Sequence, residues 1–355
     1  MMQMFLNQTI PYGVRSWLLL WALVACPAVA NDHDGEVSPS SAVPLRIHSA
    51  AITEHSGSEQ LAGGQAVGED SIWLLNTRGL TTQACRADLD SPPFEVMRMD
   101  ECGRTQAASL EEYLLGDGSE LYVIYIHGNR MEYSNAIQRG LLVRRQTLRH
   151  RCSTDLPVRW LVWSWPSAQE GVLLADVREK AERTDSQGLY LAWLLRELID
   201  RGHRPRLIGF SFGGRVATGA LHALGGGALG GRRMPAPHIE GAHVSIGLIA
   251  PALGEGWLCG YGYHGQATRN MFELSVLYNR RDAVLKRYPF LDPGSQALGY
   301  RGPRGFGPRY DGSKLPVHAR NCSGTVGRRH VEVDYYMGTC NAGKSMYQMI
   351  TKPWP

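Results

Sequence analysis

The residue best placed to do chemistry in this sequence is a serine between two glycines, in Gly209-Phe210-Ser211-Phe212-Gly213. A short apolar run, Leu207-Ile208, comes before it, and a helix-forming run follows directly. This order predicts a strand, a sharp turn and a helix, with the hydroxyl of Ser211 raised above the sheet. Side chains at Gly209 and Gly213 would collide with the neighbouring strand and helix. The pattern therefore predicts a nucleophilic serine.

A serine hydroxyl needs a base to take its proton, and the base needs an acid that orients it and stabilises its positive charge. With the serine on a strand-turn-helix, these partners follow in the chain as an acid and then a histidine. Asp282 comes just after a predicted strand at 274–278, and His330 follows the last predicted strand, within 316–326. We therefore expect Asp282 and His330 to reach Ser211.

Three other residues could take these parts. Glu255 follows a predicted strand at 244–249, and either Glu255 or Asp292 could replace Asp282 as the acid. His318 is the alternative base, but it lies at or inside the last predicted strand, where its side chain would pack or face a sheet surface. The sequence leaves the identity of the acid open.

Acyl transfer through a serine also needs backbone N–H groups that stabilise the oxyanion of the tetrahedral intermediate. One expected donor is the amide of Phe212, the residue after the nucleophile. The other is expected in His127-Gly128-Asn129, directly after an apolar strand at 121–126. Gly128 would let the backbone approach a substrate closely, so we assign the second donor to the Asn129 amide, with Gly128 as the alternative.

The elements that must position these residues alternate between strand and helix patterns from about residue 71. This alternation predicts a mostly parallel sheet with helices on both faces. The clearest helix is at 176–201, with apolar residues at helical spacing and a glycine stop. Eight strands are expected, around 72–75, 94–96, 121–126, 158–163, 206–210, 244–249, 274–278 and within 316–326.

The ordered set of motifs resembles the α/β-hydrolase superfamily, at its serine esterase and lipase end. The resemblance covers roughly residues 71–345, and a bacterial branch of unknown activity is the part it resembles most. It is carried by Tyr125-Ile126-His127-Gly128-Asn129, Trp163-Ser164-Trp165-Pro166-Ser167, Gly209-Phe210-Ser211-Phe212-Gly213, Asn279-Arg280-Arg281-Asp282 and His330.

The resemblance implies an eight-stranded, mostly parallel sheet, no metal or other cofactor, and ester hydrolysis through an acyl-enzyme on the serine. The chain departs from the lipase pattern in having His127-Gly128-Asn129 where a longer glycine run is usual. The size of the acyl pocket, and with it the substrate, is therefore left open. The alternative function is a catalytically inactive protein of the cell envelope that keeps the fold as a binding platform.

The first thirty residues have the pattern of a secretory signal peptide. Arg15 is their only charge, an apolar core spans 17–25, and Ala28-Val29-Ala30 offers a cleavage site. The alternative is a lipoprotein signal, in which Cys26 is lipidated and tethers the protein to a membrane. Both predict export, to the periplasm, the medium or a membrane surface.

The remaining chain divides into a flexible linker at 31–70, rich in Ser, Gly and Ala, and a hydrolase domain at 71–355. Loss of Arg15 with the signal changes the net charge from +4 to +3, which argues against a nucleic-acid partner. We expect a small-molecule or lipid ester as the substrate. The oligomeric state is left open.

Cysteine usage agrees with an oxidising compartment. Beyond Cys26 the sequence has six cysteines, enough for three disulfides, and no spacing that suggests zinc. Two local pairs are expected, Cys85–Cys102 and Cys322–Cys340, each of which would brace a loop. Free buried thiols are the alternative.

Overall fold

The computed structural model describes residues 69–116, 118–152, 155–171 and 173–353. The predicted signal at 1–30, with Cys26, and nearly all of the predicted linker lie outside the described residues. The described domain starts with an anchored carboxylate, because Asp70 accepts hydrogen bonds from Arg144 and Arg151 at 2.8 and 2.7 Å. Along the described chain, no helix has both the length and the apolar character needed to cross a membrane.

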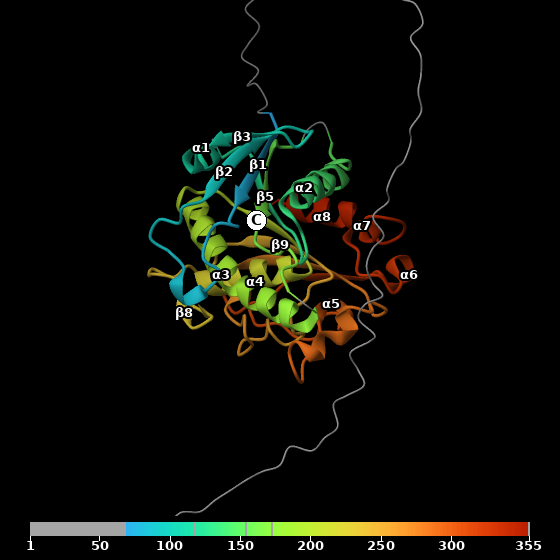
Figure 1. The fold of residues 1–355 in the computed structure, drawn as a ribbon. Coiled ribbons are helices and arrows are strands. Elements are labelled where there is room, and N and C mark those ends of the chain that lie inside the picture. Colours follow the sequence, from blue (N-terminus) through green and yellow to red (C-terminus); the bar gives the residue numbers. More distant parts are fainter. Residues whose placement is uncertain (1–68, 117, 153–154, 172, 354–355) are drawn as a thin grey trace, which may run out of the picture. The chain divides into compact units, whose positions relative to one another are not determined.

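A nine-stranded sheet forms the centre of the described domain (Figure 1), in the order β11-β10-β9-β6-β4-β5-β1-β2-β3. In this order, every neighbouring pair from β11 across to β1 is parallel. The last two strands, β2 and β3, are added at the β1 edge by antiparallel pairing. The strands are β1 (Ser71–Asn76), β2 (Glu95–Met99), β3 (Thr105–Ala108), β4 (Leu121–Ile126), β5 (Val158–Ser164), β6 (Arg206–Phe210), β9 (Val244–Ile249), β10 (Met271–Tyr278) and β11 (Val317–Asn321).

The predicted α/β class, a mostly parallel sheet with helices on both faces, is confirmed, but the expected number of strands was one too low. The missed strand is β3, whose residues Thr-Gln-Ala-Ala are mostly exposed. It pairs only with β2, so it needs no apolar face, and its sequence carries no strand signal. The other eight strands of the sheet lie where the sequence predicted them.

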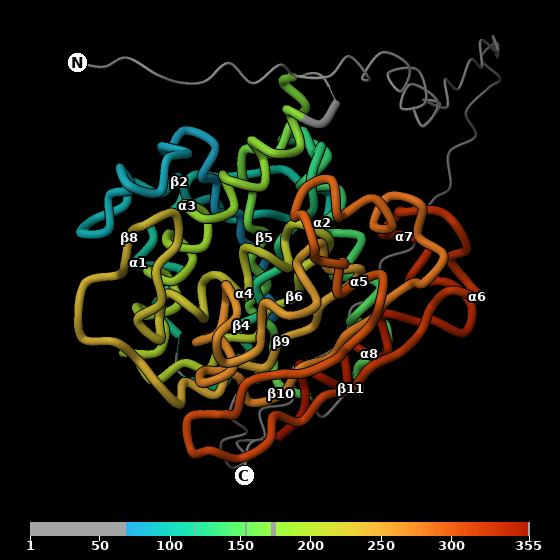
Figure 2. Tube along the Cα trace, turned by 90° about the horizontal axis from the view of Figure 1, so that it is seen from below, coloured from blue at the N-terminus to red at the C-terminus, as the bar shows by residue number. Residues whose placement is uncertain are grey.

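Helices cover both faces of the sheet. Figure 1 shows α3 and α4 on one side of the strands, and α2 and α8 on the other. The helices are α1 (Leu110–Leu114), α2 (Tyr133–Leu148), α3 (Leu173–Asp200), α4 (Phe212–Leu224), α5 (Leu298–Arg301), α6 (Ser323–Val326), α7 (Glu332–Tyr335) and α8 (Ala342–Ile350). Shorter pieces are the hairpin of β7 (Ala228–Leu229) and β8 (Arg232–Arg233) and three 3₁₀ turns, Ala84–Arg86, Ala267–Asn270 and Leu285–Phe290. Figure 2 shows the blue N-terminal elements and the red C-terminal elements at different ends of the domain.

The register of the strands tells which side chains share a face. Gly247 of β9 faces α8, because a Cβ there would run into a methionine of that helix. Its partners across the sheet, Ile208, Tyr125 and Val162, lie on the same face, and Val162 lies against α2. Gly209, the next residue along β6, faces α4 on the opposite side. Tyr125 therefore points toward the layer that contains α2.

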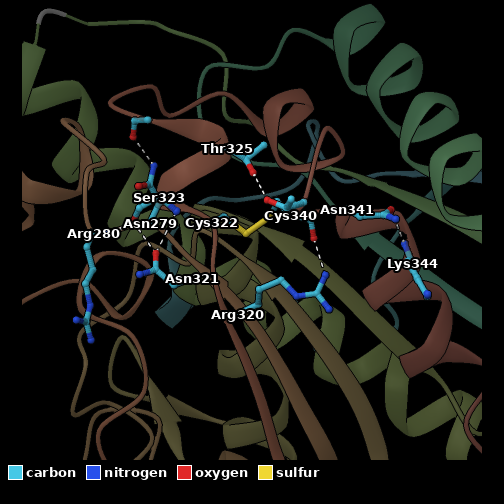
Figure 3. The surroundings of a disulfide bond; sticks show 12 residues. Asn279, Arg280, Arg320, Asn321, Cys322, Ser323, Thr325, Cys340, Asn341 and Lys344 are labelled. Atoms are coloured by element: carbon cyan, nitrogen blue, oxygen red, sulfur yellow. Dashed lines mark hydrogen bonds between the residues drawn. A yellow bond between two sulfur atoms is a disulfide. The ribbon is translucent and has the colours of Figure 1, made fainter.

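A disulfide closes the loop that follows the edge strand β11. Cys322 at the start of this loop is bonded to Cys340, 18 residues later, as the sequence predicted. Figure 3 shows the bond beside the residues that tie the loop to the end of β10. Among these ties, the side-chain amide of Asn279 donates to the carbonyl of Gly327 at 2.8 Å. The Ser323 hydroxyl accepts from the Arg280 amide at 2.8 Å.

The other expected pair, Cys85–Cys102, is not formed, and both thiols are free and exposed. Met99 of β2 pairs with Ile72, so the hairpin turn with Cys102 lies at the start of β1. Cys85 follows the other end of β1. The strand between them spans about 16 Å, whereas bonded cysteines need Cα atoms about 4–7 Å apart. Short separation along the chain was a poor guide here, because strand β2 lies between the two residues and carries the chain from one end of β1 to the other.

Removing the Cys322–Cys340 bond should lower the free energy of unfolding. We expect a loss of about 3 kcal/mol for the double variant Cys322→Ser/Cys340→Ser, since a loop of this size is no longer closed in the unfolded chain. Urea denaturation of both proteins measures the difference. Cys85→Ser, which removes an exposed free thiol, is the control and should change stability by less than about 0.5 kcal/mol. Equal stability of the double variant and the parent would contradict this prediction.

Candidate active site

Ser211 occupies a strained turn between β6 and α4. Its backbone has φ 52° and ψ −117°, a conformation that residues other than glycine rarely adopt. The turn is held by neighbouring backbone, because the Ser211 amide donates to the Ile249 carbonyl at 3.0 Å. The Ser211 carbonyl in turn accepts from Gly214 and Ala252 at 3.0 and 3.1 Å. The serine is thus fixed from both sides, and its side chain stands at the carboxyl end of the central strands.

The two glycines of the motif make room for this turn. A Cβ at Gly209 would come within 2.8 Å of the Gly213 backbone in α4. A Cβ at Gly213 would overlap the carbonyl oxygen of Ile126 at the end of β4. The first turn of α4 therefore packs directly on two strands, as the sequence pattern predicted.

Asp282 lies in a turn just after β10 and is fully buried. One carboxylate oxygen, Oδ1, accepts hydrogen bonds from the amides of Val284 and Leu285, both at 2.9 Å. The other oxygen, Oδ2, is directed at His330, whose Nδ1 lies 2.6 Å away. The turn therefore fixes the carboxylate and leaves one oxygen for the imidazole.

His330 lies in the disulfide-closed loop, between α6 and α7, and joins Asp282 to Ser211. Its Nε2 is 2.9 Å from Ser211 Oγ. Its ring stacks on Phe210, with centroids 5.2 Å apart, and its side chain is 12% exposed. Backbone bonds tie its loop to that of Asp282, since the amide of Ala283 donates to the Arg328 carbonyl at 3.0 Å. The structure thus brings together three side chains from separate parts of the chain.

The hydrogen bonds among these three groups have a defined direction. An ionised carboxylate only accepts, so Asp282 keeps the proton of a neutral His330 on Nδ1. Nε2 is then the free acceptor, and the Ser211 hydroxyl donates to it. Such an arrangement can move the hydroxyl proton to Nε2 as the oxygen attacks an electrophile.

The alternative acid and base residues lie in other surroundings. Glu255 pairs with Arg304 at 3.5 Å and with Arg301 at 3.9 Å. Asp292 accepts from the ring nitrogen of Trp257 at 3.0 Å. His318 lies on the edge strand β11, where its side chain is 63% exposed and pairs with Glu273 at 3.4 Å. None of these pairings involves Ser211, and Asp282 is the acid next to His330.

The loop after β4 packs against the serine turn. A Cβ on Gly128 would lie 2.8 Å from the Phe210 ring and 3.2 Å from the Ser211 Cβ, so glycine permits this approach. Asn129 is the next residue along this loop. The Phe212 amide belongs to the first turn of α4, where N–H groups have no partner within the helix. The two expected oxyanion donors thus come from the residue after Ser211 and from the residue after Gly128.

His127 supports this loop as a neutral, buried side chain. Burial lowers the pKa of His127 to about 3, mainly because the charged ring would lose its hydration. Its Nδ1 donates to the Gly128 carbonyl at 2.9 Å, and its Nε2 accepts from the Trp165 amide at 3.2 Å. The Trp165 ring nitrogen donates back to the His127 carbonyl at 2.9 Å. This histidine holds the loop and is not available as a base.

The supporting roles of two residues were missed from the sequence, although one of them, Ser167, belongs to a motif that carries the resemblance. Arg78 lies after β1, and its guanidinium donates to Ser164 Oγ at 2.9 Å and to the Met131 carbonyl at 2.8 Å. The Ser167 carbonyl accepts from the Arg130 amide at 2.7 Å. Both brace the loop after β4, but an arginine or serine beyond a strand looks like an ordinary turn residue. Within the described ranges, no three His, Cys, Asp or Glu side chains are grouped to hold a metal ion.

Comparisons with known proteins give distant likenesses. No family model matches the chain, and neither does any curated protein. Similar solved structures include esterase B from Lactobacillus rhamnosis, inhibited by a C6-C4 SN3 compound (14% identity, TM-score 0.35, 80% of this chain and 85% of the esterase). The same esterase inhibited by a C4-C4 SN3 tributyrin phosphonate scores 0.34 at 14% identity, over 80% of this chain and 86% of the esterase. Thermogutta terrifontis esterase 2, phosphoramylated by tabun, is 10% identical, with a TM-score of 0.29 over 66% of this chain and 82% of its own. Likenesses at this level do not assign a function, so a function must be argued from the geometry of the site.

Substituting Gly213 by alanine should damage the serine turn. The new methyl group would overlap the Ile126 carbonyl, a backbone atom that cannot move aside, so we expect a stability loss of about 1–3 kcal/mol. Urea denaturation and circular dichroism measure the loss. Gly256→Ala is the matched control, because no atom lies within 4 Å of a Cβ there. Similar losses in the two variants would contradict the close packing described here.

Proposed function

We propose that this protein is a serine hydrolase that cleaves carboxylic esters through an acyl-enzyme on Ser211. The observation that carries the proposal is the continuous hydrogen-bonded chain from Asp282 Oδ2 through His330 to Ser211 Oγ, with distances of 2.6 and 2.9 Å. Its order in the sequence, serine then acid then histidine, is the one that a strand-turn-helix nucleophile requires.

In the proposed reaction, Ser211 Oγ attacks the ester carbonyl carbon while its proton moves to His330 Nε2. Asp282 stabilises the imidazolium that forms. The amides of Phe212 and Asn129 donate to the oxyanion of the tetrahedral intermediate. The intermediate collapses, the C–O bond to the alcohol breaks, and the leaving alkoxide takes the proton from Nε2.

The acyl group is then released by water. A water molecule gives its proton to His330 Nε2 and attacks the acyl carbon, through a second oxyanion at the same two amides. Collapse of this intermediate frees the carboxylic acid, and Ser211 regains its proton from Nε2. No step in this cycle requires a cofactor.

The place of action is part of the proposal. The Cys322–Cys340 disulfide supports an oxidising compartment such as the periplasm or the medium, because such bonds are rare in reducing cytosol. Cleavage after Ala30 and lipidation at Cys26 both fall outside the described residues. Mass spectrometry of the native N-terminus separates the two, since lipidation adds diacylglycerol to Cys26.

Ser211→Ala should abolish hydrolysis of short p-nitrophenyl esters and labelling by a fluorophosphonate, because both need the Oγ nucleophile. We expect turnover to fall at least about 10³-fold, toward the level left by oxyanion stabilisation and binding alone. Circular dichroism checks that the fold is kept, and Ser91→Ala, at an exposed surface serine, is the control. Undiminished labelling in the Ser211 variant would overturn the proposal. A parent protein that neither labels nor turns over any ester would support the inactive binding platform instead.

Asp282→Asn should lower kcat by about 10⁴-fold, because an amide can hold the imidazole in the wrong tautomer and cannot stabilise its charge. Asp292→Asn and Glu255→Gln are the matched controls, since both residues are bonded to partners other than His330. Their kcat should stay within about twofold of the parent. A large loss in either control together with an active Asp282 variant would reassign the acid.

A further inference from the structure

Glu332 is a buried acid that the proposed reaction does not use. It begins α7, two residues after His330, and only 2% of its surface is exposed. Charged carboxyl groups are seldom buried so completely without partners, because they lose their hydration. What surrounds this one is therefore informative.

The carboxyl group joins three separate elements. Its Oε2 accepts a hydrogen bond from the Tyr125 hydroxyl on β4 at 2.8 Å. The same oxygen pairs with the guanidinium of Arg139 on α2 at 3.3 Å. Tyr125 stands two residues before His127, at the base of the loop that contains Gly128 and Asn129. One carboxyl group thus links the loop of His330 to the strand and helix on either side of the predicted oxyanion loop.

This link is unfavourable for stability when the acid is ionised. Burial raises the pKa of Glu332 to about 7, although Arg139, the Tyr125 hydroxyl and His330 all act to lower it. The other facing titratable group, Tyr336 on the same turn, is itself buried and stays neutral. Oε1 is buried as well and has no hydrogen-bond partner among the described residues. Above pH 7, a neutral side chain of the same shape would therefore give a larger free energy of unfolding.

We propose that Glu332 is a positioning residue, whose carboxylate holds the loop of His330 at a fixed separation from the Gly128-Asn129 loop. The inference rests on the proposed function, because the separation matters only if the imidazole and the oxyanion donors act on one substrate. Backbone bonds tie the loop of His330 to that of Asp282, but they do not reach the loop after β4. The Glu332–Tyr125–Arg139 contact supplies that tie on the face of the sheet that is covered by α2.

The test compares Glu332→Gln with the parent at pH 8, using p-nitrophenyl butyrate and a fluorophosphonate to count active sites. We expect kcat per labelled site to fall about tenfold or more, with KM within about twofold, since small displacements of reacting groups have effects of this size. Glu101→Gln, which removes an exposed partner of Arg144, is the control and should leave kcat unchanged. A kcat per labelled site equal to that of the parent would overturn the inference.

Stability supplies a readout that a merely structural role would not give. Glutamine resembles the protonated acid, so the parent and Glu332→Gln should melt at similar temperatures at pH 5. A raised folded-state pKa means that the parent loses stability as the pH rises from about 4.5 to about 7. At pH 8 the variant should therefore melt at a higher temperature while its kcat is lower. A variant that melts lower at both pH values, with kcat per labelled site unchanged, would make Glu332 structural and overturn the proposal.

The link to β4 is tested separately with Tyr125→Phe, which removes the donor and keeps Glu332 paired with Arg139. We expect the same direction of change in kcat, and a double variant with Glu332→Gln that is less impaired than the product of the two single effects. Independent, multiplying effects would overturn the link. If the parent itself neither labels nor turns over ester, the proposed function fails first. If the parent is active and the variants keep its kcat per labelled site, only the positioning role of Glu332 is overturned.

Discussion

The 2.6 Å bond between His330 and Asp282 is the contact on which the rest of the site depends. Hydrogen bonds such as that from the Ala283 amide to the Arg328 carbonyl bring the loop after β11 to the end of β10, and the bond to Asp282 gives the imidazole its orientation. Asp282 can serve because the amides of Val284 and Leu285 already hold its other oxygen. Without this fixed carboxylate the proton on the imidazole would have no preferred nitrogen, and Ser211 would face either a donor or an acceptor. The sheet positions the loops, and this bond orients the imidazole so that its Nε2 faces Ser211 Oγ.

Much of this arrangement could be predicted from sequence because it depends on local rules. Steric limits force Gly209 and Gly213 around Ser211, and strands buried on both faces must be apolar throughout. Parallel strands end at the same edge of the sheet, so Ser211, Asp282 and His330, which each follow a strand, can meet there. The serine turn and the buried strands can be recognised in a single sequence because each depends on a few adjacent residues.

The features that escaped prediction depend on contacts that the local pattern does not contain. The strand β3 has no apolar face, because only β2 pairs with it. Cys85 and Cys102 are close in the chain, but they lie in turns beyond opposite ends of β1. Glu332 stands among charged residues that look solvated, and its burial is set by Tyr125, 207 residues away. A tyrosine inside a wholly buried strand was the one available hint, since its hydroxyl must find a partner.

The position of His330 inside the closed 322–340 ring has a consequence for biosynthesis. The imidazole lies 119 residues after the serine, so a nascent chain that has left the ribosome only as far as α4 has Ser211 without His330. The ring that braces the imidazole can close only where thiols are oxidised. If the protein is exported as proposed, a precursor still inside a reducing cytosol would lack the bond that closes the loop of His330, and the proposed catalytic arrangement would be braced only after export.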